Sequence, residues 1–186
     1  MVITETRLKG AFVIELEPFN DIRGFVAQAW SDREFEACGL SARFVQTIIS
    51  FNQKKGTLRG MHYQVAPYEQ SKLVRCTRGS IYDVIVDLRP ESPTFKEWFP
   101  LEMSAQNHLM LYVPVKFAHG FQTLEDETEV TYQTSDYYAA SHGRGVRWND
   151  PAFNIAWPDN SRIMIERDCD YPDFAVQLGP GQIKSN

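Results

Sequence analysis

The sequence is poor in the residues that build disulfide frameworks, metal centres and membrane spans. It has only three cysteines, Cys38, Cys76 and Cys169, which are widely spaced and form no CxxC pair. A scattered, odd-numbered set of this kind predicts neither a disulfide-rich fold nor a zinc site. No apolar run approaches the ~18 residues of a membrane helix, and the opening segment MVITETRLKG lacks the apolar stretch of a signal peptide. We therefore expect a reduced, cytoplasmic protein that does not bind membranes.

The sequence also lacks an excess of positive charge. Its net charge is −5 at pH 7, whereas general nucleic-acid and membrane-surface binders carry a basic surplus. A small anionic ligand held by a few local arginines is still compatible with this charge. Because there is no Walker loop and no GxGxxG motif, we do not expect a phosphate to be held at a helix N-terminus.

Short β-like runs dominate what is present in the 186 residues. They are rich in Val, Ile, Tyr, Phe and Thr and are bounded by Gly, Pro, Asn or Asp. Many short strands with almost no helix between them predict an all-β antiparallel sandwich or barrel. One helix is expected at 31–39, with Ser31 as N-cap and Gly39 as the stop. The expected strands cover 11–16, 24–30, 44–51, 72–77, 80–88, 98–103, 109–114, 118–124 and 128–135, and the stretch 56–64 is treated as a further candidate strand.

The length is most simply that of one domain, 1–186, and no repeat, low-complexity tract or linker divides it. After residue 136 the chain becomes irregular, with turn-rich stretches such as SHGRG and WPDNS. We expect this segment, 136–186, to pack on the outside of the barrel.

The stretch GTLRGMHYQ, residues 56–64, places unusual side chains in a predicted strand. Strict alternation puts His62 on one face with Leu58, and Arg59 on the other. An inward histidine in a small barrel is either a buried residue satisfied by a backbone carbonyl or a group that meets a ligand. Lys72, His119 and Tyr132 also lie within or beside predicted strands, where a solvated edge charge or a core tyrosine is the simpler interpretation.

Metal binding is not favoured by this pattern. A metal-binding barrel of the cupin type needs two histidines on one strand face, and the same-face neighbour of His62 is Gln64. We expect His108 and His142, which lie in polar turn-like stretches, to be solvated. No metal is therefore predicted. Arginines at strand ends, such as Arg23 and Arg59, can instead grip a phosphate or diphosphate, although pairing with surface carboxylates explains most arginines of the chain.

Six motifs in register give the sequence a family resemblance. DIRGF, GTLRGMHYQ, KLVRCTRGSIYDVIVDLRPESPTF, FAHGFQTL, TEVTYQTSDYY and GVRWNDPAFNIAWP follow in this order between about residues 5 and 174. Together they resemble the dTDP-4-dehydrorhamnose 3,5-epimerases, which have a cupin-type jelly-roll fold. The resemblance implies a cofactor-independent epimerase of a dTDP-linked 4-keto-6-deoxyhexose in deoxysugar biosynthesis, assembled as a homodimer.

The resemblance also implies roles for individual residues. His62 is similar to the general base of the family, Asp168 to the carboxylate that orients this base, and Tyr132 to the general acid on the opposite face of the sugar. Lys72 corresponds to the lysine near the developing enolate. Substrate-contacting positions of the family match Gln46, Arg59, His119 and Tyr138, and Arg23 matches a residue lent across the dimer interface.

This set of residues suits the chemistry. A proton beside a ketone can be removed only if the enolate is stabilised, so a base and an electrostatic partner are needed together. Histidine, with a reference pKa of about 6.5, is suited to accept that proton near neutral pH. Inversion then requires reprotonation from the other face, which a tyrosine across the cavity can provide. A carboxylate would fix the histidine tautomer and stabilise the imidazolium.

The chain departs from the family pattern at four positions, which lie in segments that we expect to contact substrate or support the pocket. The resemblance alone therefore leaves open whether C3, C5 or both are epimerised. It also leaves open a sugar-nucleotide-binding homologue without turnover, a ketoisomerase of the same superfold and a metal-dependent cupin enzyme. The departures are Val26 and Gln28, where the family commonly has an aromatic and a glutamate, and Ile48 and Lys116, where it often has asparagine and glycine.

Overall fold

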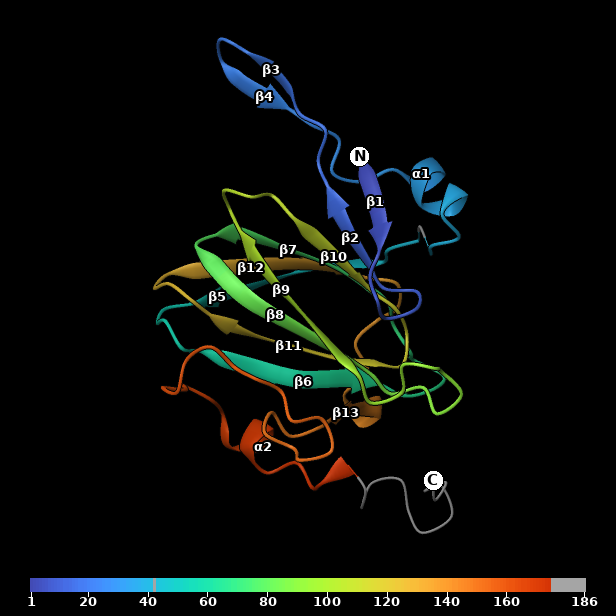
Figure 1. Cartoon of the computed structure of the whole chain (residues 1–186), viewed down its shortest axis with the longest axis vertical. Coiled ribbons are helices and arrows are strands. Elements are labelled where there is room, and N and C mark those ends of the chain that lie inside the picture. Colours follow the sequence, from blue (N-terminus) through green and yellow to red (C-terminus); the bar gives the residue numbers. More distant parts are fainter. Residues whose placement is uncertain (42, 175–186) are drawn as a thin grey trace.

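Antiparallel strands form the body of the molecule, as the strand-like runs of the sequence predict (Figure 1). The computed structural model describes residues 1–41 and 43–174, so the last part of the predicted C-terminal segment, 175–186, lies outside the described residues. One sheet has six strands in the order β1 (Val2–Glu5), β2 (Phe12–Glu15), β10 (Met110–Val113), β7 (Lys72–Arg78), β12 (Thr128–Thr134) and β5 (Gln46–Asn52). The other has five, in the order β13 (Gly143–Gly145), β6 (Leu58–Gln64), β11 (Phe117–Thr123), β8 (Ser80–Asp87) and β9 (Trp98–Ser104).

The two sheets face each other and enclose the main core. Alternation along β8 turns Ile81, Asp83 and Ile85 toward the interior, where the two isoleucines pack against Val74 and Cys76 of β7. The remaining interior is filled by apolar side chains at one end and by ionisable ones at the other. The sandwich therefore has an apolar end and a polar end, and the polar end holds the site described below.

The outer faces of both sheets are partly covered. Residues of the irregular segment after 136, such as Val146, Phe153 and Phe174, pack on the outward side chains of β8 and β11. On the six-stranded sheet, Phe35 of α1 (Asp32–Ala37) is fully buried against the outward face of β2, β7 and β10. Burial of one aromatic side chain of this size stabilises the fold by roughly 1.5–3 kcal/mol, which fixes α1 against the sheet.

The helix predicted at 31–39 is confirmed as α1. Ser31 is its N-cap, and the Ser31 hydroxyl accepts a hydrogen bond from the Glu34 backbone N–H at 3.4 Å. The helix ends before Gly39, whose φ of +72° is the left-handed conformation that commonly follows a helix.

One predicted strand is too long, and several short elements were not predicted. The strand expected at 24–30 stops at Val26, because β4 (Gly24–Val26) pairs only with β3 (Phe19–Asp21) in a hairpin that projects from the body (Figure 1). A two-stranded ribbon with no further strand beside it gains little from being longer. The short elements that were missed are β1, β3, β13, the 3-10 turn η1 (Ala140–His142) and α2 (Glu166–Cys169).

Candidate active site

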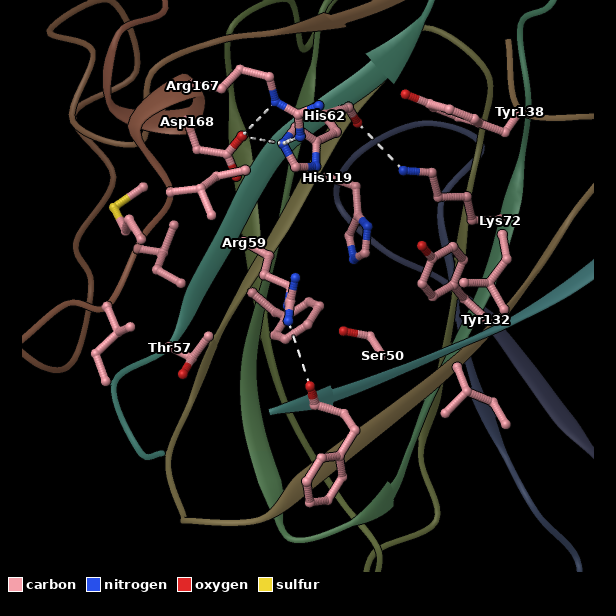
Figure 2. A pocket seen from close by; sticks show the side chains of 18 residues that line it. Ser50, Thr57, Arg59, His62, Lys72, His119, Tyr132, Tyr138, Arg167 and Asp168 are labelled. Atoms are coloured by element: carbon pink, nitrogen blue, oxygen red, sulfur yellow. Dashed lines mark hydrogen bonds and ion pairs between the residues drawn. The ribbon is translucent and has the colours of Figure 1, made fainter. Parts of the chain in front are cut away.

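A cavity of about 680 Å³ opens at the polar end of the sandwich. A second hollow of about 490 Å³ shares His62, Lys72 and Tyr132 with it, so the two are lobes of one site. Figure 2 shows the His62 ring on one side of the space and the Tyr132 ring on the other, with His119 between them and the Lys72 amine pointing from the Tyr132 side toward His62. The sequence-predicted residues in these lobes are Gln46, Arg59, His62, Lys72, His119, Tyr132, Tyr138 and Asp168.

His62 and Asp168 form a close pair at the wall of the cavity. The His62 Nε2 atom lies 2.8 Å from Asp168 Oδ1, and the Gly60 backbone N–H donates to Asp168 Oδ2 at 3.2 Å. Because a carboxylate can only accept, Nε2 carries the hydrogen and the lone pair is left on Nδ1. The His62 side chain is 33% exposed, so Nδ1 is available as a base.

Burial and hydrogen bonding act in opposite directions on Asp168. Its carboxylate is almost completely buried, and burial alone would raise the Asp168 pKa. The hydrogen bond from His62, the positive charge that His62 can carry, the Gly60 N–H and the Arg167 guanidinium together outweigh that effect and lower the pKa. Asp168 is therefore ionised at neutral pH and stabilises an imidazolium at His62.

A peptide segment beside β6 delivers Asp168 to this place. Ile163 forms a bridge with Thr57, and the Leu58 N–H donates to the Ile163 carbonyl at 3.0 Å. The chain then enters α2, where Asp168 is the buried residue. A carboxylate more than a hundred residues from His62 in sequence is thus placed against it.

The predicted alternation of β6 is wrong at Arg59, which lines the same cavity as His62. His62 pairs with His119 and Arg59 pairs with Phe121, so β6 has three residue steps where β11 has two. The extra residue is a β-bulge at Gly60, whose φ is +133°. A Cβ atom at this position would lie only 2.5 Å from the Gly120 Cα, so glycine is also required by the close approach of β11.

Lys72 and Tyr132 face the cavity from the six-stranded sheet. Burial lowers the pKa of Lys72 to about 8, and the charge of Asp83 partly opposes this shift. The Lys72 Nζ atom donates to the His62 carbonyl at 3.4 Å, which places the ammonium on the His62 side of the cavity. Burial also raises the pKa of Tyr132, against the opposing effect of Arg59, so its phenol is protonated at neutral pH.

Tyr138 and Gln46 lie at the outer part of the site. The Tyr138 backbone N–H donates to Gln46 Oε1 at 2.9 Å. Gln64 holds the same segment, because its Nε2 donates to the Tyr137 carbonyl at 3.1 Å and its Oε1 accepts from the Ala139 N–H at 2.7 Å. The two glutamines therefore fix the peptide that carries the exposed Tyr138 ring. In the sequence, Gln64 is notable only because it stands where a metal-binding barrel would have a second histidine. In the structure it is a clamp that holds the 137–139 segment.

Arg23 is the one predicted site residue that is not brought to the cavity within this chain. It lies at the tip of the β3–β4 hairpin, where its side chain is 82% exposed and pairs with Asp21 at 2.5 Å. The expected role of Arg23 therefore requires a second copy of the chain.

Some residues of the site were not found by sequence reasoning. Arg167 lines both lobes, and its Nε donates to Asp168 Oδ1 at 3.2 Å. Tyr171 lines the second lobe. The position of Arg167 next to Asp168 was a signal in the sequence that Arg167 could belong to the site. Tyr171 had no such signal, because only the path of the chain after α2 brings it there.

The departures from the family pattern have different structural settings. Ile48 lines both lobes, as expected of a substrate-contacting position. Lys116 is exposed in the turn before β11 with a φ of +63°, a conformation suited to glycine, and it does not line either lobe, whereas His119 of the same segment does. Gln28 donates to Glu34 at 3.1 Å, and Val26 is exposed on the hairpin.

His108 and His142 are half-buried rather than solvated. The His108 ring packs edge-on against Phe25 with centroids 5.0 Å apart, and His142 contacts Tyr68. Within residues 1–41 and 43–174 there is no group of three or more His, Cys, Asp or Glu side chains that could hold a metal ion. The same described part of the chain has no helix long and apolar enough to cross a membrane.

The fold and the site define a class of protein: a cupin-type β-sandwich whose open end holds a histidine–aspartate pair opposite a tyrosine. The family model for dTDP-4-dehydrorhamnose 3,5-epimerase matches residues 5–176. The chain therefore belongs to the dTDP-4-dehydrorhamnose 3,5-epimerase family, and the resemblance inferred from its motifs is confirmed.

Individual proteins agree with this assignment. The dTDP-4-dehydrorhamnose 3,5-epimerase of Shigella flexneri is 40% identical over 175 residues, which cover 94% of this chain and 96% of that protein. The crystal structure of the enzyme from Elizabethkingia anophelis superposes with a TM-score of 0.92 at 37% identity, covering 95% of this chain and 98% of that one. A 3'-monoepimerase from Streptomyces bikiniensis, in complex with dTDP-quinovose, gives a TM-score of 0.87 at 31% identity, covering 95% and 90%.

Proposed function

We propose that the chain is an isomerase that epimerises a dTDP-linked 4-keto-6-deoxyhexose at C3, C5 or both, in deoxysugar biosynthesis of the rhamnose type. The observation that carries the proposal is the placement of His62 and Tyr132 on opposite sides of one cavity (Figure 2). A base and an acid that face each other across a hexose can remove a proton from one face and return one to the other. Membership of the epimerase family supports the same reaction.

The first step takes a proton from a carbon next to the ketone. His62 Nδ1 accepts the proton, the electrons of the C–H bond form a carbon–carbon double bond, and the ketone oxygen becomes an oxyanion. The Lys72 ammonium stabilises that oxyanion, and Asp168 stabilises the imidazolium through the 2.8 Å contact. No electrons leave the substrate, so the reaction needs no redox cofactor.

The second step returns a proton to the opposite face. Tyr132 gives its phenolic proton to the same carbon, the ketone re-forms, and a phenolate is left. Because burial raises the Tyr132 pKa, this phenolate readily regains a proton from solvent as the imidazolium loses one. His62 alone would only return the proton to the face from which it came.

The remaining predicted residues surround this centre in a way that suits the nucleotide. Arg59 is oriented by Asn52, whose Oδ1 accepts from Arg59 Nε at 2.7 Å, and the guanidinium is exposed toward the cavity. A guanidinium held in this way is suited to a diphosphate. The exposed ring of Tyr138 lines both lobes, and we place the nucleoside of the dTDP group against it, beside Gln46.

A homodimer completes the proposal. Phe19, Ile22 and Val26 are 74%, 104% and 72% exposed on the projecting hairpin, an apolar surface that a monomer would leave in water. A second copy that covers the hairpin would bring Arg23 to the neighbouring cavity. The free thiols of Cys38, Cys76 and Cys169 are compatible with a reducing compartment, and we place the enzyme in the cytoplasm.

The direct test incubates the enzyme with dTDP-4-keto-6-deoxyglucose in D₂O and follows deuterium at each carbon by NMR. We expect deuterium at C3, C5 or both, together with inversion of the labelled centre. Label at C3 only would place the chain with the 3'-monoepimerase that it resembles. Absence of deuterium at both carbons would contradict the activity on this substrate. Binding without exchange would indicate a non-catalytic homologue, and a displaced carbonyl would indicate a ketoisomerase.

A further inference from the structure

A second aspartate, Asp83, lies behind the cavity and has no place in the mechanism above. Asp83 and His119 are diagonal neighbours on the inward faces of β8 and β11, because Asp83 pairs with Phe121 and Ile85 with His119. The Asp83 side chain is fully buried, and its Oδ2 lies 2.8 Å from His119 Nε2. Its Oδ1 has no hydrogen-bond partner among the described residues.

The contact with Asp83 decides which hydrogen-bonding face His119 presents to a ligand. The carboxylate accepts from Nε2, so the hydrogen lies on Nε2. Burial lowers the His119 pKa, against the opposing effect of Asp83, so the ring is neutral at neutral pH and its Nδ1 carries a lone pair. His119 lines the cavity beside Lys72 (Figure 2). It therefore offers an acceptor, and it has no proton to donate to a ketone.

The charge of Asp83 also acts on Lys72. An ammonium buried as deeply as that of Lys72 tends to lose its proton, and Asp83 is the group that opposes this loss. The other ionisable groups that face Lys72 from the packed elements are His62 of β6, His119 of β11 and Tyr132 of β12. None of these three side chains supplies a negative charge at neutral pH. The carboxylate of Asp168 is engaged by His62 and Arg167.

We propose that Asp83 is a positioning residue that sets opposite polarities at the floor of the sugar site, an inference that rests on the proposed function. Asp83 holds His119 as an acceptor for a hydroxyl of the hexose, and its negative charge stabilises the Lys72 ammonium as a donor to the ketone. A 4-keto sugar has a ketone, which only accepts, next to the C3 hydroxyl, which can donate. The two polarities together distinguish the carbonyl carbon from its neighbour and place the correct C–H bond at His62.

The tautomer can be measured without any substrate. Long-range ¹H–¹⁵N NMR on the full-length, ¹⁵N-labelled protein distinguishes a protonated from an unprotonated ring nitrogen, and a His119→Gln variant assigns the signals among the four histidines. We expect a neutral His119 ring at pH 7 with the hydrogen on Nε2. An Nδ1–H tautomer or an imidazolium at this pH would overturn the proposal, whether or not any Asp83 variant folds.

Asp83→Asn tests the charge separately, because the amide oxygen can still accept from Nε2. The rate should fall as pH rises through the Lys72 pKa of about 8, since only the ammonium stabilises the oxyanion. In Asp83→Asn we expect this alkaline fall in kcat/KM to move down by about one pH unit, which would reduce kcat/KM at pH 7 by roughly twofold because about half of the ammonium is then lost. An alkaline limb unchanged from that of the wild type would contradict the role of the charge.

Asp87→Asn is the matched control. Asp87 is also a fully buried aspartate of β8, but its partners are Arg89, Ser92 and Thr94, away from the cavity. We expect the control to lower the melting temperature while leaving the alkaline limb at the wild-type pH. Failure of the wild type to exchange any proton would reject the proposed function alone, because the tautomer measurement does not depend on turnover.

Discussion

Two histidines of one cavity are each paired with an aspartate, and burial gives the two histidines different roles. His62 and His119 each contact a carboxylate through Nε2 at 2.8 Å. The His62 side chain is 33% exposed, whereas that of His119 is 6% exposed. An imidazolium can therefore form at His62, where solvent and Asp168 stabilise its charge, whereas burial disfavours an imidazolium at His119. Residue type and pairing alone would not separate the base from the binding residue.

The orienting role of Asp168 leads to a prediction at this scale. In Asp168→Asn the amide can place its NH₂ group toward His62 and so favour the wrong tautomer, with the hydrogen on Nδ1. We expect kcat to fall by roughly 100-fold or more with little change in KM, measured by product formation at pH 7. The exposed neighbour Asp170 provides the control, and Asp170→Asn should retain wild-type kcat. Equal kcat in both variants would remove Asp168 from the mechanism.

At the scale of elements, the strands were predictable and their local irregularities were not. Strand alternation divides 80–88 into two faces, but both faces of β8 are buried, so the sequence alone does not say which face turns inward. The bulge in β6 depends on the approach of Gly120 from β11, a contact between strands that no local pattern contains. The predicted faces of β6 were therefore wrong at Arg59.

The site residues could be predicted where motifs resemble those of the family. They could not be predicted where contacts between distant parts of the chain determine the role of a residue. His62, Lys72 and Tyr132 could be named from strand motifs, and the structure places them in one cavity. The roles of Asp83 and Gln64 depend on hydrogen bonds to other strands and loops. Side chains that act through partners in this way leave no signal in a single sequence.

Lys116 gives a stability prediction for the turn before β11. A lysine at φ +63° carries a left-handed penalty of roughly 1 kcal/mol that glycine avoids, partly offset by the greater freedom of glycine in the unfolded chain. We expect Lys116→Gly to raise the free energy of unfolding by up to about 1 kcal/mol in urea titrations, with unchanged kcat. Lys116→Ala keeps the penalty and should not stabilise. Equal stabilisation by both variants would show that the backbone conformation is not the cause.

The glutamine clamp gives a second prediction at this scale. In Gln64→Glu the donor to the carbonyls of Tyr68 and Tyr137 is lost, and a carboxylate is placed against two acceptors. Because Gln64 acts on the segment of Tyr138 and not on the reacting carbon, we expect KM to rise roughly tenfold while kcat is largely retained. Gln70→Glu, which alters a single contact to the Asp136 carbonyl, is the milder comparison. A fall in kcat without a change in KM would contradict the positioning of Tyr138.

At the scale of the whole molecule, the site of one chain is incomplete. Arg23 is exposed at the tip of the projecting hairpin, and within the described residues it contacts only its own hairpin (Figure 1). The apolar side chains beside it are also uncovered. Both features are accounted for if the hairpin packs on a second copy and Arg23 reaches the neighbouring cavity.

Mixing two inactive variants tests this arrangement. Arg23→Ala and His62→Ala each disable every site of their own homodimer. After subunit exchange, mixed dimers contain one site with both native residues, so roughly a quarter of all sites should regain activity. Native mass spectrometry confirms that the mixed dimers have formed. Mixed dimers without any recovered turnover would place Arg23 outside the partner's site.

The opposed placement of His62 and Tyr132 is the central claim, and Tyr132→Phe in D₂O tests it most directly. The variant keeps the base and Lys72 but has no proton to give from the far side. The account predicts that this variant still exchanges the proton beside the ketone, read carbon by carbon by NMR, while the configuration at that carbon is retained. Inversion at a rate close to that of the wild type would contradict the account, because His62 or solvent would then deliver the proton to the opposite face of the carbon.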